Sequence, residues 1–264
     1  MRKHPALMSY AFFYLAFLYL PVLFLPLFSF NASPFIAFPL TGFTTRWYEG
    51  LFADTAMQHA LANSLKVGAC AALLSTLLGL LAAKAVTGYR LRGTHAVLGF
   101  ISLPLFIPDI VLGISLLLLL GALEVPLALG TVILGHLLIC VPFALTVLVA
   151  RFEGFDRNLE EASADLGEGP WMTFWRVTLP LMLPGIIASL LLTFITSFDE
   201  FLVAWFLSGT DATLPVYIWG QLRFPERLPL VLALGAIILV VSVALVVAAE
   251  LLRNRGVRQA RVGA

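Results

Sequence analysis

The chain of 264 residues is 61% hydrophobic and 12% charged, with a formal net charge of +1 and a mean hydropathy of +0.99. Soluble domains carry about 25% charged residues, so this composition excludes an ordinary soluble domain and indicates a polytopic membrane protein. It offers no basic patch for nucleic acid. Cys70 and Cys140 both lie inside apolar segments, and we interpret them as small buried hydrophobic residues, with neither a disulfide nor a metal site expected.

Six apolar segments predict an all-α membrane protein, because continuous apolar runs of this length cross a bilayer as helices. The first run is too long for the apolar core of a signal peptide. Pro104 and Pro108 are expected to break the third. We expect a single transmembrane domain over residues 1–264, with its core at about 60–251. The six segments are residues 6–30, 60–83, 96–121, 128–150, 181–207 and 229–251.

Positive charge divides the polar segments between two sides. Twelve basic residues share a side with both termini and the loop at 151–180, and three lie on the other. The positive-inside rule therefore predicts that both termini and this loop are cytoplasmic. The twelve are Arg2, Lys3, Lys84, Arg90, Arg92, Arg151, Arg157, Arg176, Arg253, Arg255, Arg258 and Arg261; the three are Arg46, Arg223 and Arg227.

The first half of the loop at 151–180 is predicted to be a short amphipathic helix. Asp156 or Asn158 can cap its N-terminus, and Asn158 with Glu161 is close to a capping box. Gly167 can adopt a positive φ and end the helix, and Pro170 can begin a second short helix. One apolar stripe is expected at Leu159, Ala162, Ser163 and Leu166.

The same loop carries a spaced pattern: Glu161-Ala162-Ser163, three residues, Gly167, nine residues, then Val177-Thr178-Leu179-Pro180. It resembles the EAA loop of ABC importer permeases, with Ser163 and Val177 as departures from the usual residues. The resemblance implies a type I ABC importer permease fold, in which the helix at 157–167 is a cytoplasmic coupling helix seated in a groove of an ATPase. The coupling residues that it implies are Glu160, Glu161, Ala162, Asp165, Leu166, Gly167 and Pro180.

Three acidic residues fall inside predicted spans, where an ionised group costs at least about 2.5–3.5 kcal/mol and usually faces a cavity or a partner. Asp109 follows Pro108 near the middle of the third span, and Asp199 and Glu200 lie in the later half of the fifth. Carboxylates along a pathway suit a cationic solute. Adjacent residues point about 100° apart on a helix, so at most one of Asp199 and Glu200 faces a pathway directly.

Ser197 and Phe198 can add a hydroxyl and an aromatic face for cation–π contact to such a pathway. The alternative for Asp109 and Asp199 is structural, as carboxylates that cap a broken helix or pair with a basic side chain. His136 is expected to be a hydrogen-bonded core residue rather than a ligand.

Further motifs resemble the C-type permease of spermidine/putrescine importers over nearly the whole chain. They include Gly42 to Tyr48, Pro108 to Leu116, Ser197 to Phe201, Ser208-Gly209 and Leu214 to Ile218. The resemblance implies that Asp199 acts in polyamine passage, with Glu200 as the second acid. The chain departs at Pro225-Glu226-Arg227-Leu228-Pro229, where Arg227 and nearby Arg223 add positive charge that would suit a solute with both an amine and a carboxylate.

The chain has no nucleotide-binding motif and no catalytic motif, so we expect a transport subunit and not an enzyme. ATP and Mg²⁺ would be bound by a partner ATPase. The resemblance implies a second similar permease, two ATPase subunits and a periplasmic solute-binding protein, in the lipid of a bacterial inner membrane. Import of an ω-amino acid or another small solute is one alternative. Another is an ion-driven carrier with Asp109 and Asp199 as relays, although no internal inverted repeat is present, and a third is a scaffold without a transport role.

Overall fold

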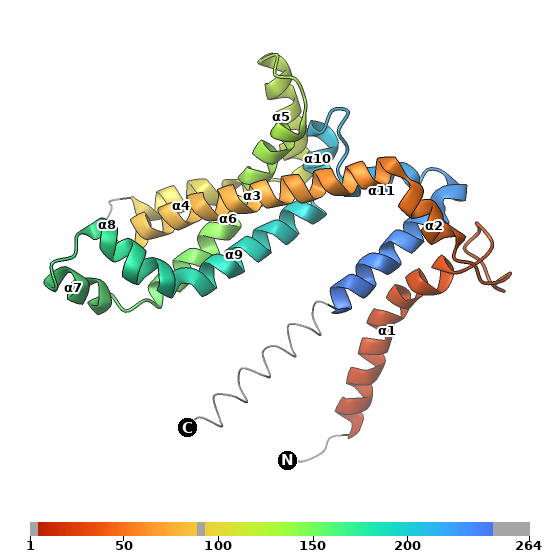
Figure 1. The fold of residues 1–264 in the computed structure, drawn as a ribbon, viewed down its shortest axis with the longest axis horizontal. Helices are drawn as coiled ribbons and strands as arrows, with labels where there is room; N and C mark the ends of the chain where they lie inside the picture. The colour runs from red at the N-terminus through yellow and green to blue at the C-terminus, as the bar shows by residue number, and fades with distance from the viewer. Residues whose placement is uncertain (1–4, 89–92, 245–264) are drawn as a thin grey trace. The chain divides into compact units, whose positions relative to one another are not determined.

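The computed structural model describes residues 5–88 and 93–244, which are mostly helical (Figure 1). Several predictions concern residues outside the described ranges: Arg2, Lys3, Arg90, Arg92, the four C-terminal arginines and the end of the sixth span at 245–251. The chain divides into two compact units, one of residues 58–217 and one that combines residues 1–57 with 218–264.

The unit of residues 58–217 is built around α6 (Leu129–Glu153), which has the largest buried share of the candidate membrane spans. α6 packs against α9 and α10, and α10 also packs against α5. In Figure 1, α7 and α8 lie at one end of this unit and α5 and α10 lie toward the other. The further elements are α3 (Thr55–Gly88), α4 (Thr94–Ser102), η1 (Leu103–Phe106), α5 (Asp109–Ala122), α7 (Asn158–Asp165), α8 (Pro170–Thr173), η2 (Phe174–Thr178), α9 (Leu179–Asp199), α10 (Leu202–Leu207) and α11 (Leu214–Gln221).

Small residues bring the helices of this unit close together, which is how helices associate in lipid without a hydrophobic driving force between them. A Cβ added to Gly79 of α3 would lie 2.8 Å from Cβ of Ala144 in α6. The buried hydroxyls of Thr76 and Ser189 lie 2.9 Å apart and join α3 to α9. α3, α6 and α9 are therefore held both by packing and by a hydrogen bond.

The other unit contains α1 (Pro5–Ser29), α2 (Arg46–Ala53) and the final candidate span Pro225–Ala244, which begins with η3 (Pro225–Arg227). The indole N–H of Trp47 donates to the Asn31 carbonyl at 2.7 Å and ties α2 to the segment after α1. Arg227 forms an ion pair with Asp54 at 3.5 Å.

The predicted six spans are recovered when the bent pair at Ala96–Phe106 and Asp109–Ala122 counts as one span. This pair bends by 99°, which confirms the predicted break at Pro104 and Pro108. Each of the other five candidate spans is a single helix that is long and apolar enough to cross a membrane.

Three expectations about the spans were wrong. α3 extends beyond both ends of the expected segment at 60–83. The fifth span at 181–207 is not one helix, because α9 ends at Asp199 and α10 begins at Leu202. Cys70 is exposed on α3, whereas Cys140 is buried as expected.

Candidate functional site

The segment predicted to be cytoplasmic and to couple to an ATPase forms α7, which begins one residue later than the expected helix and ends two residues earlier. Asp156 Oδ1 accepts the backbone N–H of Asn158 at 3.0 Å. The residue at the N-cap is Arg157, without a side-chain capping bond, so the expected box between Asn158 and Glu161 does not form. The Asp156 carboxylate satisfies an N–H that the first turn leaves free.

The end of α7 follows the predicted glycine signal. Gly167 has φ +90°. Its N–H donates to the Ala164 carbonyl at 2.9 Å, and the N–H of Glu168 donates to the Ser163 carbonyl at 3.2 Å. This pair of bonds is a Schellman motif, which requires the left-handed conformation that glycine adopts without a Cβ penalty. Pro170 begins α8 as predicted.

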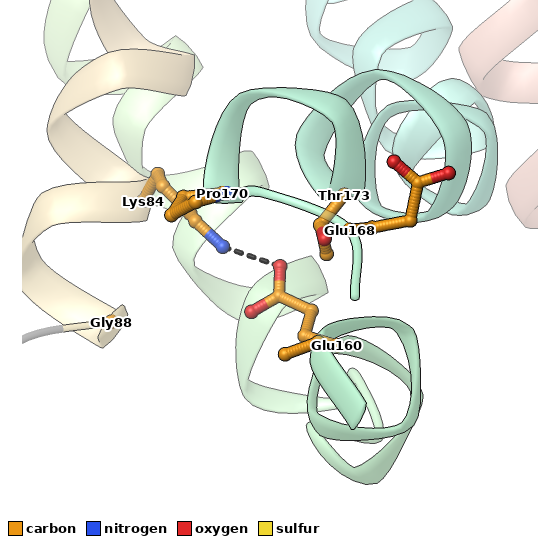
Figure 2. A pocket seen from close by; sticks show the side chains of 7 residues that line it. Lys84, Gly88, Glu160, Glu168, Pro170 and Thr173 are labelled. Carbon is orange, nitrogen blue, oxygen red and sulfur yellow. Dashed lines mark hydrogen bonds and ion pairs between the residues drawn. The ribbon is translucent and has the colours of Figure 1, made fainter. Parts of the chain in front are cut away.

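The face of α7 that packs inward carries Glu160 and Ser163, which are three residues apart and therefore neighbours on one side of the helix. The Glu160 carboxylate accepts hydrogen bonds from Lys84 Nζ of α3 and from Thr178 Oγ1 of η2. The ion pair with Lys84 is drawn in Figure 2. The Ser163 and Thr173 hydroxyls are buried and lie 3.0 Å apart. These contacts attach α7 to α3, α8 and η2.

The charge state of Glu160 reflects these partners. Partial burial raises the pKa of the Glu160 carboxyl, but the hydrogen bonds from Lys84 and Thr178, with the charges of Lys84 and Arg157, outweigh that effect and lower the pKa below its ordinary value. Glu160 is therefore an anion at neutral pH.

The outward face of α7 carries Glu161, Asp165, Leu159 and Leu166. Leu159 and Leu166 are 44% and 87% exposed, so these two members of the expected apolar stripe are not buried in the chain. The only buried member of the stripe is Ser163. A groove lies beside this face and is lined by Leu159, Ala162, Ser163, Leu166, Glu168, Arg176, Val177, Pro180 and Leu181. Exposed leucines next to acidic side chains form a surface suited to another protein.

Lys84, Thr173 and Thr178 were not among the predicted coupling residues. Sequence signals could have identified two of them. Lys84 is a cation near the end of a long apolar segment, and Thr178 lies inside the Val177-Thr178-Leu179-Pro180 motif. Thr178 is fully buried in the structure. Buried hydroxyls need partners, and the acidic side chain on the neighbouring helix is such a partner.

The second group of predicted residues lies where two helices are interrupted. α9 ends at Asp199, and the backbone of Glu200 is extended with φ −69° and ψ 120°. Glu200 Oε1 accepts the N–H of Val203 at 2.6 Å, which caps the first turn of α10. Asp199 is exposed and Glu200 is half-buried. Because Glu200 lies outside α9, Asp199 and Glu200 do not share one helix, and the expected separation of about 100° between their side chains does not apply.

Asp109 lies in the first turn of α5, directly after Pro108 and near the middle of the bent third span, as expected. It is exposed. α5 packs against α10, so the two interrupted spans bring Asp109 and Glu200 into one region. Phe198 is half-buried and its ring stacks on Phe194 at a centroid distance of 5.8 Å.

Ser197 lies in the interior of the unit of residues 58–217. Its Oγ lies 2.7 Å from Nδ1 of His136, and both residues are buried. The expectation that His136 is a hydrogen-bonded core residue is confirmed, and the expectation that Ser197 offers a hydroxyl to solute is wrong. Among the described residues, no group of three or more His, Cys, Asp or Glu side chains could hold a metal ion.

Residues 75–257 match the family described as "Binding-protein-dependent transport system inner membrane component". The chain is 38% identical over 236 residues to the putrescine transport system permease protein PotI of Escherichia coli K12, covering 84% of each chain. It is 35% identical over 212 residues to the spermidine/putrescine transport system permease protein PotC of the same strain, covering 80% of each.

A solved structure of a bacterial ABC transporter involved in the import of the acidic polysaccharide alginate contains a chain with a similar fold. The TM-score is 0.75 at 16% identity, over 94% of this chain and 98% of that one. The fold, the family match and the two relatives agree. The chain belongs to the family of inner membrane components of binding-protein-dependent transport systems.

Proposed function

We propose that the chain is a permease subunit of an ATP-driven importer that moves a polyamine of the putrescine or spermidine type from periplasm to cytoplasm by alternating access. The relatives at 38% and 35% identity are named for putrescine and for spermidine/putrescine transport. The observation in the structure that favours a cation is the position of Asp199 at the C-terminal end of the 21-residue helix α9. A helix C-terminus carries partial negative charge, which adds to the carboxylate in attracting an amine.

We assign different roles to the two adjacent acids. Asp199 is exposed and would contact the solute, with Phe198 beside it and Asp109 as a further anion of the pathway. Glu200 is committed to the N–H of Val203 and holds α10 in place after the break. Interrupted helices are common at substrate sites in transporters, because their ends supply partial charges within the membrane.

The outward face of α7 would dock in a groove of a cytoplasmic ATPase, with Glu161, Asp165 and Leu166 at the contact and Gly167 fixing the end of the helix. The complete transporter would contain a second similar permease, two ATPase subunits that bind ATP and Mg²⁺, and a periplasmic solute-binding protein. Both termini would be cytoplasmic. The exposed carboxylates and leucines of α7 support such a docking surface.

A solute with both an amine and a carboxylate remains the second candidate, because Arg223 and Arg227 add positive charge before the last span. The ion pair between Arg227 and Asp54 offsets part of that charge and favours a purely cationic solute. Competition of an ω-amino acid against labelled putrescine distinguishes the two. Dependence of uptake on the partner ATPase, and not on ion gradients, distinguishes the importer from an ion-driven carrier.

The test is uptake of radiolabelled putrescine in cells that express the whole transporter. We expect Asp199→Asn to reduce uptake at least about tenfold, equivalent to ~1.4 kcal/mol, while the complex still assembles. Glu200→Gln is the matched control, because an amide oxygen can still accept the Val203 N–H, and it should retain most uptake. Import of an ω-amino acid without polyamine import would refute the solute, and a greater loss in Glu200→Gln than in Asp199→Asn would refute the division of roles.

A further inference from the structure

Three elements that are distant in sequence meet at the Glu160 side chain, and Figure 2 shows the contact of Glu160 with Lys84. Lys84 comes from the last turns of α3, Glu160 from α7, and Thr178 from the end of η2, where α9 begins. Both Lys84 and Thr178 donate to Oε1 of Glu160. One carboxylate oxygen therefore links a membrane-spanning helix, the short cytoplasmic helix and the start of a second span.

A second contact connects the same ends of α3 and α7. The Arg157 guanidinium, at the N-cap of α7, donates to the backbone carbonyl of Thr87 in α3. That carbonyl is one of the last four of its helix, which have no partner within the helix. Two side-chain contacts therefore join α3 to α7. In one, the cation Lys84 of α3 donates to α7, and in the other, the cation Arg157 of α7 donates to α3.

The space beside these contacts is not filled by packing. A cavity of about 360 Å³ is lined by Lys84, Gly88, Glu160, Ala164, Glu168, Pro170 and Thr173. The backbone of α7 packs against α8 and η2 instead. Because van der Waals contact is incomplete on the α3 side, the polar contacts hold α3 to α7 and leave room for both helices to shift.

The contacts of Lys84, Glu160 and Thr178 are partly shielded from solvent, which strengthens them. The side chains of Lys84 and Glu160 are 30% and 27% exposed, and Thr178 is fully buried. A buried hydroxyl that loses its acceptor carries a desolvation cost, so Thr178 favours the conformation in which Glu160 points inward. Glu161, the next residue, is exposed, so the two adjacent acids of α7 face different partners.

We propose that Lys84, Glu160 and Thr178 form a mechanical junction that makes α3 move together with α7 and α9 when the ATPase closes. Glu160 and Lys84 are positioning residues of this junction, and Glu160 acts within the permease and not on the ATPase. The inference rests on the proposed function of α7 as the ATPase-docking helix. It adds α3 to the helices that receive the movement.

The test uses the complete transporter in proteoliposomes, with Lys84→Met, Glu160→Gln and the charge exchange Lys84→Glu with Glu160→Lys. Three quantities are measured: retention of the ATPase on purification, putrescine imported per ATP hydrolysed, and the distance distribution between spin labels at Leu77 of α3 and Asn158 of α7. The labelled chains carry Cys70→Ser and Cys140→Ala. Glu153→Gln, which removes an exposed acid at the end of α6, is the matched control.

We expect both single variants to retain the ATPase, to import less putrescine per ATP by about threefold or more, and to broaden the label distances. The charge exchange should restore a narrow distribution and most of the transport ratio, and Glu153→Gln should match the wild type. The proposed junction would be refuted if Lys84→Met imported as much putrescine per ATP as the wild type. It would also be refuted if the charge exchange restored neither this transport ratio nor the narrow label distances. If putrescine is not a solute, uptake fails in the wild type as well, whereas the label distances still decide the junction.

Discussion

The packing of α10 between α5 and α6 predicts a strong effect of adding one methyl group to Gly135. A Cβ at this position would lie 2.6 Å from Cγ1 of Val203 and 2.7 Å from Cδ1 of Leu207. Both neighbours are fully buried in α10, so neither can rotate into open space. Gly135→Ala must therefore push α10 away from α6, and with it the capped turn that follows the break at Glu200.

The magnitude follows from two opposing contributions. Overpacking a dense core costs about 1–3 kcal/mol, and replacement of glycine by alanine in a helix contributes about 1 kcal/mol in the other direction. Gly130→Ala in the same helix and Gly99→Ala in α4 are matched controls, because an added Cβ meets no atom within 4 Å at either position. We expect Gly135→Ala to be less stable than these controls by about 1–3 kcal/mol.

The assay is thermal unfolding of the detergent-purified transporter, combined with putrescine uptake at equal surface expression. Gly135→Ala should unfold at a lower temperature than Gly130→Ala and should lose uptake, because displacement of α10 disturbs the break that directly follows Asp199. Equal stability of Gly135→Ala and the two controls would refute the close contact of α6 with α10. Lower stability with unchanged uptake would refute the link between this packing and the pathway.

Ser197→Ala should lower stability by about 1 kcal/mol, seen in the same thermal assay, because His136 Nε2 already has no partner among the described residues and Nδ1 would lose its own; an unchanged midpoint would contradict this. Gly167→Val should cost about 1–3 kcal/mol of local strain at φ +90° and weaken ATPase retention, whereas Gly167→Asn should be milder, because asparagine tolerates this conformation; equal retention by both variants would argue against the motif. The lowered pKa of Glu160 means that the stabilisation from Lys84 is present at neutral pH and is lost only as pH falls through that lowered value. The label distances between α3 and α7 should therefore stay narrow from about pH 8 to pH 5 and broaden in stronger acid, and broadening near pH 6 would show that the pair does not hold the helices.

Most of the fold could be predicted from local patterns. Long apolar runs identify helices in a membrane protein regardless of their neighbours, because lipid satisfies no backbone group. Pro104 and Pro108 placed the break in the third span, since proline removes a helical hydrogen bond wherever it lies. Gly167 and Pro170 placed the end of α7 and the start of α8 for equally local reasons, a positive φ and a fixed φ.

The break between Asp199 and Leu202 was not predicted, because no proline or glycine marks it. It is stabilised by the Glu200 carboxylate, which accepts an N–H of the following helix, and by the packing of α10 between α5 and α6. The role of Ser197 could not be predicted from a local pattern either, because its partner His136 lies 61 residues away in the sequence.

The sequence by itself determined the membrane class, the number of spans and the coupling-loop pattern, because these depend on composition and on spacings within one segment. The tertiary structure alone decided which face of each helix does what. α7 turns Glu160 inward and leaves Leu159 and Leu166 exposed, the reverse of what hydrophobicity predicts, whereas Ser163 of the expected stripe is buried. The physical reason is that the inward partners, Lys84, Thr173 and Thr178, are polar and come from other elements. A helix buries the face for which its neighbours provide partners, and those neighbours are set by the fold.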